Sequence, residues 1–169
     1  RDLMYTASLG KHGPFAIRYP RGGGRMIDWR TPMNEVEIGK GRRLRDGNQV
    51  AVLSIGTVGP DVADAVAKAV GEGVDAAHYD MVFLKPIDEN ILQEVAAKGC
   101  PIVTVEDGSV NGGLGGAVAE WMTAHGHSPR ITRLGIPDKF VTQGTPAQLR
   151  HLCGFDTDAI VKAILNAKE

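Results

Sequence analysis

Cysteine is scarce in this chain, which holds only Cys100 and Cys153 and has no Cys-x-x-Cys pair. Two cysteines at such distant positions argue against a disulfide framework and against a metal site built on thiolates. They are typical of the reduced, packed thiols of cytosolic proteins. We therefore expect a cytoplasmic protein.

An excess of one charge is also missing, because 19 Lys and Arg residues stand against 20 Asp and Glu residues, giving a formal net charge of −1. This balance argues against a nucleic-acid-binding surface and against a polybasic membrane surface. The expected partners are small molecules or proteins, with no nucleic acid and no membrane.

Long apolar runs are absent as well, since no stretch approaches 18 uninterrupted apolar residues. The N-terminal RDLMYTASLGKHG lacks the apolar core of a signal peptide. A chain of 169 residues suits one main core and is too short for two large domains. Because it starts on Arg1 and not on methionine, we expect it to begin within a longer protein.

What the sequence does contain is a regular alternation of apolar runs and amphipathic segments. Strands are predicted at 50–55, 78–84, 101–107 and 129–136, and helices at 60–73, 87–99, 117–126, 145–153 and 156–168. Strand and helix repeated with short connections predict right-handed βαβ units. The expected fold is α/β, a three-layer open sheet that is mostly parallel and has one antiparallel edge strand.

The N-terminal part has a different composition. A helix is predicted over 3–9 and a short buried strand over 15–19, and Gly, Arg and Asp then dominate from Pro20 to Pro32. That change predicts a linker and a domain boundary near residue 35. Farther on, Asp46-Gly47 separates a basic strand (38–44) from the apolar strand at 50–55, a pattern that predicts a β-hairpin. The basic strand would be the antiparallel member of the sheet.

Candidate functional residues are sought in the loops that follow the strands, where open parallel sheets bind ligands. Glu106 and Asp107 are adjacent carboxylates at a predicted strand end, which suits a general acid or base; capping of the next helix or an interface ion pair is favoured. The NGGLGG loop (111–116) offers N–H groups to an anion but departs from the dinucleotide-binding fingerprint. Close packing of helix and strand is the favoured interpretation of that loop.

Metal and nucleophile motifs are lacking. The five histidines lie on different predicted elements, and His125-x-His127 has no further ligands that we can place. Neither a Gly-x-Ser-x-Gly elbow nor a Walker loop occurs. These patterns alone do not make up a complete active site.

The stretch AIRYPRGGG (16–24) has a chemistry of its own. An arginine that follows a strand and a proline, with glycines behind it, can direct its rigid fork toward an oxyanion such as phosphate. Arg18 and Arg21 are the two candidates. From the residues alone, an interface ion pair or a solvated arginine fits equally well.

Several stretches resemble the C-terminal part of the 1-deoxy-D-xylulose-5-phosphate synthase family, thiamine-diphosphate enzymes of the transketolase superfamily. They are GPFAIRYPRG, IGKG, LSIGT, DMVFLKPID, VTVEDGSVNGGLGGAVAE and LGIPDKFVTQGT. The resemblance implies a homodimeric transferase that condenses pyruvate with D-glyceraldehyde 3-phosphate and releases CO2. That reaction would serve non-mevalonate isoprenoid, thiamine and pyridoxal biosynthesis.

The same resemblance implies how the chain is divided. Residues 1–22 would end the pyrimidine-binding domain, 23–35 would be a linker, and 36–169 would form the transketolase C-terminal domain. Arg21 would bind the phosphate of glyceraldehyde 3-phosphate, with Arg18 as a weaker candidate. The motifs for thiamine diphosphate and Mg²⁺ and the catalytic residues would lie upstream of Arg1, so the fragment alone would be inactive, with an interdomain and dimerisation role.

One departure and two alternatives stay open. Members of the family often carry an arginine where this chain has Val82, so the resemblance does not carry over an anion contact or an interdomain pairing at this position. A transketolase-like or 2-oxo acid dehydrogenase β-type chain is one alternative reading. The other is a free-standing dimerisation or regulatory module.

Overall fold

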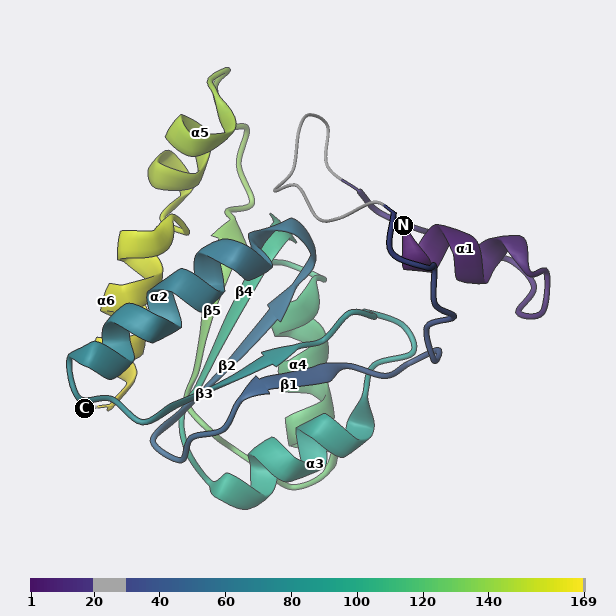
Figure 1. Ribbon diagram of the computed structural model, residues 1–169. Helices are drawn as coiled ribbons and strands as arrows, with labels where there is room; N and C mark the ends of the chain where they lie inside the picture. The colour runs from purple at the N-terminus through teal and green to yellow at the C-terminus, as the bar shows by residue number, and fades with distance from the viewer. Residues whose placement is uncertain (20–29, 169) are drawn as a thin grey trace.

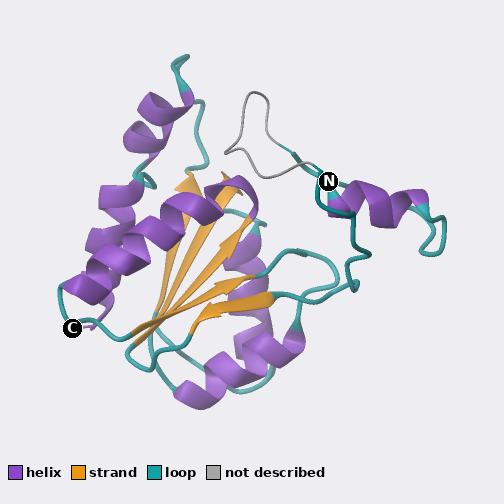
Figure 2. Ribbon diagram, in the orientation of Figure 1, coloured by secondary structure: helices purple, strands orange, loops and turns teal. Residues whose placement is uncertain are grey.

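The computed structural model describes residues 1–19 and 30–168, which contain a five-stranded sheet between helices (Figures 1 and 2). The strands are β1 (Arg42–Arg45), β2 (Val50–Ile55), β3 (Ala76–Asp80), β4 (Ile102–Ser109) and β5 (Ile131–Ile136). Their order across the sheet is β1-β3-β2-β4-β5. β3, β2, β4 and β5 run parallel, and β1 is antiparallel at one edge. The predicted fold class is confirmed.

Helices cover both faces of the sheet. They are α2 (Gly59–Gly71), α3 (Glu89–Lys98), α4 (Leu114–Ala124), α5 (Pro146–Cys153) and α6 (Thr157–Lys168), preceded by α1 (Asp2–Ser8) and a short turn η1 (Gly56–Val58). On one face Val50 and Val52 pack with side chains of α2 and α6. On the other, Leu53 and Tyr79 pack with α3 and α4. β2 is therefore buried from both sides, as the apolar run of residues 50–53 predicts.

Local sequence signals account for the helix ends. The Asp88 side chain accepts the N–H groups of Asn90 and Ile91 at the start of α3, and Gly99 ends that helix in the left-handed conformation. Thr145 and Gln148 form a reciprocal capping box at the start of α5.

The predicted hairpin between β1 and β2 is wrong. β1 pairs with β3, with Arg42 opposite Asp80. Both edges of β2 are already taken, because β3 and β4 flank it. Gly47 carries the chain across the start of β3, so close to it that a Cβ on Gly47 would lie 2.5 Å from the carbonyl carbon of Ala76. Asp46-Gly47 therefore carries the chain past the start of β3 and does not form the turn of a β-hairpin.

The short buried strand predicted over 15–19 is also wrong. These residues form no strand, and Ala16, Arg18 and Tyr19 are exposed. A strand needs a neighbour to complete its backbone hydrogen bonds, and none pairs with this segment within the described ranges. Several predicted boundaries also shift. The basic strand expected over 38–44 is Arg42–Arg45, the strand expected over 78–84 is Ala76–Asp80, and the helix expected over 117–126 is Leu114–Ala124.

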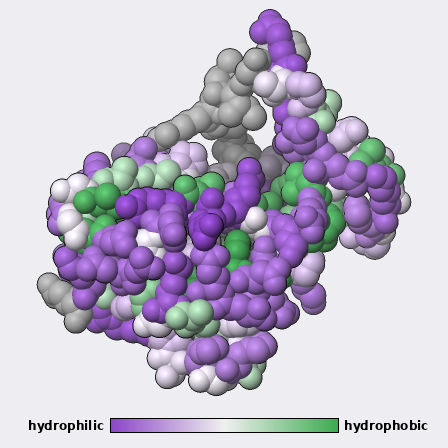
Figure 3. Space-filling view, turned by 60° about the horizontal axis from the view of Figure 1, so that its bottom comes forward, coloured by the Kyte–Doolittle hydropathy of each residue, from purple (hydrophilic) through white to green (hydrophobic). Residues whose placement is uncertain are grey.

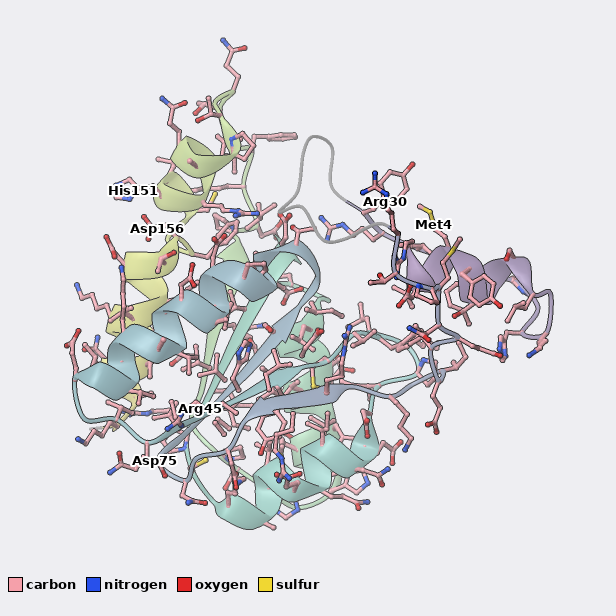
Figure 4. The ribbon with its side chains drawn as sticks, viewed as in Figure 1. Met4, Arg30, Arg45, Asp75, His151 and Asp156 are labelled. Atoms are coloured by element: carbon pink, nitrogen blue, oxygen red, sulfur yellow. The ribbon has the colours of Figure 1, made fainter. Side chains whose placement is uncertain are left out.

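Within the described part of the chain, no helix is both long enough and apolar enough to cross a membrane. Figure 3 shows a mostly hydrophilic face with small, separate hydrophobic patches. Polar contacts lie on the surface, such as the ion pair of Arg45 with Asp75 beside β3 and the hydrogen bond between His151 of α5 and Asp156 (Figure 4).

Candidate functional site

The candidate site lies where the parallel strands end. Two contacts bring the N-terminal segment to this edge. The rings of Phe15 and Phe83 meet edge to face with centroids 6.3 Å apart. The Arg18 Nη1 atom lies 2.8 Å from the position that a Cβ on Gly108 would take. We call Phe15, Arg18, Phe83, Glu106 and Gly108 the carboxyl-edge site.

Glu106 is the buried charge of this site, with 4% of its surface exposed. Its Oε2 atom accepts the N–H of Leu114 at 2.9 Å, and its Oε1 atom accepts the N–H of Gly115 at 3.0 Å. Gly113, at the N-cap of α4, has no side chain to serve those donors. A carboxylate at a helix N-terminus is stabilised by the free N–H groups and by the helix dipole. Of the two favoured interpretations, a helix cap or an interface ion pair, the structure shows the cap for Glu106.

Asp107 points the other way. Successive side chains of a strand alternate between the two faces of the sheet, so adjacent carboxylates on β4 diverge. The Asp107 Oδ2 atom accepts the Thr57 hydroxyl at 2.7 Å. Glu106 and Asp107 therefore do not form an acid–base couple, and each is engaged with a neighbour.

Glycines let Glu106 reach its partners. A Cβ on Gly113 would lie 1.9 Å from the Glu106 Oε2 atom, and one on Gly135 would lie 3.0 Å from its Cγ. A Cβ on Gly115 would lie 2.8 Å from the Thr104 hydroxyl oxygen. The NGGLGG loop thus serves close packing, and Glu106 occupies the helix N-terminus that an anion would need.

The structure describes one of the two arginine candidates, Arg18. Arg18 is exposed, and its guanidinium lies over Gly108. The Glu106 Oε2 atom is 3.4 Å from the same Cβ position, so the two charges converge there. Arg21 lies outside the described residues, and its phosphate contact stays a prediction.

Val82 occupies an unusual backbone conformation next to the site. Its φ angle is +52°, a region that β-branched residues rarely adopt. The Val82 N–H donates to the Asp80 Oδ1 atom at 3.1 Å. The next residue is Phe83, whose ring contacts Phe15.

Two of the histidines, His78 and His125, contact neighbouring side chains of the fold. His78 is buried, its Nε2 atom lies 2.9 Å from the Ser54 hydroxyl, and burial lowers the pKa of its ring to about 4. His125 stacks on the Trp121 ring at 4.0 Å. No group of three His, Cys, Asp or Glu residues in the described ranges could hold a metal ion. Glu106 also occupies the N-terminus of α4, so the N–H groups of Leu114 and Gly115 are not free for an anion.

A hollow of about 310 Å³ lies between β5 and α6 and includes Arg130, Thr132, Lys162 and Asn166. Arg130 precedes β5, so the hollow is at the opposite end of that strand from the carboxyl-edge site. The Arg130 guanidinium donates to the Asn166 carbonyl at 3.0 Å and to the Ala167 carbonyl. It thereby caps the C-terminus of α6.

Sequence reasoning did not identify Gly108 as a residue of the carboxyl-edge site. The glycine that follows Glu106-Asp107 was visible as a strand-end residue, but nothing local indicated that a distant arginine would lie over it. The pairing of Thr57 with Asp107 was missed for the same reason.

Comparison with known proteins gives a consistent family. Residues 39–160 match the family described as "Transketolase, C-terminal domain". The whole chain is 51% identical to 1-deoxy-D-xylulose-5-phosphate synthase of Bacteroides thetaiotaomicron. It is 42% identical, over 97% of its length, to the synthase of the same name from Azoarcus sp. (strain BH72). The chain spans about a quarter of these relatives, 26% of each.

Solved structures show the same fold. A "Split gene transketolase, inactive beta4 tetramer" superposes with a TM-score of 0.73 at 32% identity, over 80% of this chain and 44% of that one. A transketolase mutant from Pichia stipitis gives a TM-score of 0.55 at 16% identity, over 77% of this chain and 18% of that one. The second likeness shows the fold alone.

Proposed function

Because this chain belongs to the transketolase C-terminal domain family, we propose that it serves as the C-terminal part of a 1-deoxy-D-xylulose-5-phosphate synthase. The observation that carries the proposal is an identity of about one half to such synthases along the entire chain. The whole enzyme would be a homodimeric cytoplasmic transferase. It would condense pyruvate with D-glyceraldehyde 3-phosphate and release CO2, with thiamine diphosphate and Mg²⁺ held by residues outside this chain.

This part of the enzyme would position the acceptor without itself carrying out the chemistry. Glu106 and Asp107 are engaged with α4 and Thr57, which leaves neither placed as a proton donor. Arg21 would hold the phosphate of glyceraldehyde 3-phosphate with its bidentate fork, so that the aldehyde faces the reacting carbon. Residues 1–22 and 36–169 would belong to two domains joined by 23–35.

The test is to supply the complete protein with thiamine diphosphate, Mg²⁺, pyruvate and glyceraldehyde 3-phosphate and to measure 1-deoxy-D-xylulose 5-phosphate by mass spectrometry. The 169-residue chain is assayed in parallel. Product from the complete protein alone supports both the reaction and the division of roles. Product from neither contradicts the assigned reaction, and product from the chain alone contradicts the placement of the chemistry.

A transketolase is the second candidate, because a split-gene transketolase shares 32% identity over 80% of this chain. A transketolase would transfer a two-carbon unit between sugar phosphates and would not consume pyruvate. Incubating the complete protein with two sugar phosphates and no pyruvate separates the two candidates.

A further inference from the structure

We propose that Gly108 and Glu106 form a seat for the guanidinium of Arg18, and that this seat is a positioning device for acceptor binding. The first half stands on the geometry of the described residues. The second half rests on the proposed function.

The seat exists because position 108 has no side chain. A Cβ at Gly108 would lie 2.8 Å from the Arg18 Nη1 atom and 3.4 Å from the Glu106 Oε2 atom. The cation and the carboxylate therefore converge on one small volume that only glycine leaves open. In this conformation, any larger residue at position 108 competes with the Arg18 side chain for that volume.

Charge favours occupation of the seat by Arg18. Glu106 is buried, and its carboxylate is fixed by the N–H groups of Leu114 and Gly115. Opposite charges near a low-dielectric interior attract each other more strongly than in water. Within the described ranges Arg18 makes no hydrogen bond or ion pair, with Glu106 or with any other residue, and Glu106 is the carboxylate that shares the space over Gly108 with its guanidinium.

A second anchor fixes the course of the same segment. Three residues before Arg18, the ring of Phe15 contacts Phe83 after the end of β3. Residues 15–19 pair with no described strand, so these two anchors hold the segment across the carboxyl edge. Arg21 follows Arg18 by three residues, and a misplacement of about 1 Å at a binding group can cost about a hundredfold in rate.

The seat is tested first in the chain itself, without any activity. Gly108→Ala places a methyl group in the seat, whereas the matched control Gly116→Ala places one in open space on α4. Trypsin has to draw the Arg18 side chain into its own pocket to cleave the Arg18–Tyr19 bond. We expect Gly108→Ala to be cleaved there about tenfold faster than the parent chain, and Gly116→Ala at the parent rate. Equal rates in all three proteins would overturn the seat.

The positioning role is tested by kinetics of the complete protein. Gly108→Ala is expected to raise the KM for glyceraldehyde 3-phosphate about tenfold and to leave the KM for pyruvate within about twofold. Arg18→Met, which keeps an unbranched side chain without its charge, provides a second variant that does not touch the core. Faster trypsin cleavage with both KM values unchanged would overturn the positioning role. If the parent protein makes no 1-deoxy-D-xylulose 5-phosphate, the proposed function and its positioning role fail, and the trypsin result still decides the seat.

Discussion

At the scale of single residues, burial decides which polar side chains have free chemistry. Glu106 and His78 are both buried, and each is tied to a named partner in the fold. Residues of this kind are expected to affect stability more than catalysis. Two predictions follow from their environments.

His78 makes stability depend on pH. Burial lowers the pKa of its ring from 6.5 to about 4. Below pH 6.5 the unfolded chain binds a proton that the folded chain does not, so stability falls as the pH drops from 6.5 toward 4. The loss reaches on the order of 2–3 kcal/mol at the lower end of that window. Urea unfolding at pH 7.5, 6 and 5 measures it.

A matched variant isolates this effect. His78→Gln keeps a hydrogen-bonding group for Ser54 but does not titrate, so its stability should vary less between pH 7.5 and 5. Asp46 and Asp156 have lowered pKa values, Asp46 mainly through Lys98 and Asp156 mainly through the Ala159 N–H. Their contributions disappear only as the pH falls below about 4. A steep slope retained by His78→Gln would contradict the assignment to His78.

Removing the Glu106 carboxylate should destabilise α4. Glu106→Ala leaves the N–H groups of Leu114 and Gly115 buried without an acceptor, at a cost of about 2–4 kcal/mol. Asp107→Ala is the control, because it removes a single bond to the partly exposed Thr57 and should cost about 1 kcal/mol. Urea unfolding of both variants measures the free energy of unfolding that each one loses. Equal losses would argue against the capping role of Glu106.

At the scale of elements, one prediction concerns the crossing between β1 and β2. A Cβ on Gly47 would lie 2.5 Å from the Ala76 backbone, so Gly47→Ala should destabilise the chain by about 1–3 kcal/mol. Gly71→Ala at the end of α2 meets open space and should be neutral or stabilising by up to about 1 kcal/mol. Thermal unfolding compares the two. A harmless Gly47→Ala would mean that the chain does not pass as closely to β3 as described.

The same elements show how far sequence reasoning reaches. β2 and β4 were predictable because an apolar run bounded by turn residues is a local pattern, and α3 was predictable from its Asp88 cap and Gly99 stop. The partner of β1 was not predictable from a local pattern. It depends on the order of the whole sheet, in which β3 and β4 flank β2 and leave an edge of β3 for β1. The place of Glu106 at a strand end left a helix cap and an interface ion pair both open, and the structure shows the cap. The contact of Arg18 with Gly108 joins distant parts of the chain, and no local pattern encodes such a contact.

At the scale of the whole molecule, the sheet supplies an edge and the N-terminal segment brings Arg18 to it. Figure 1 shows α1 lying outside the layers of the sheet and its helices. Its link to the rest of the chain includes the Thr6 hydroxyl, which accepts the Val36 N–H at 2.8 Å. The positioning role that we propose assigns the sheet to support the site and the N-terminal segment to carry the arginines that bind the acceptor.

Arg21→Ala in the complete protein tests that division directly. Loss of one charge-assisted phosphate contact is worth about 1.5–3 kcal/mol, so the KM for glyceraldehyde 3-phosphate should rise about 10- to 100-fold while that for pyruvate changes little. Arg42→Ala serves as the control, because Arg42 is an exposed arginine of β1 whose ion pair with Asp80 spans 3.4 Å. Surface pairs of this kind contribute at most about 1 kcal/mol, so both KM values should stay close to those of the parent. Since pyruvate carries no phosphate, an equal rise in both KM values for Arg21→Ala would mean that Arg21 supports the fold of the edge and does not bind the acceptor.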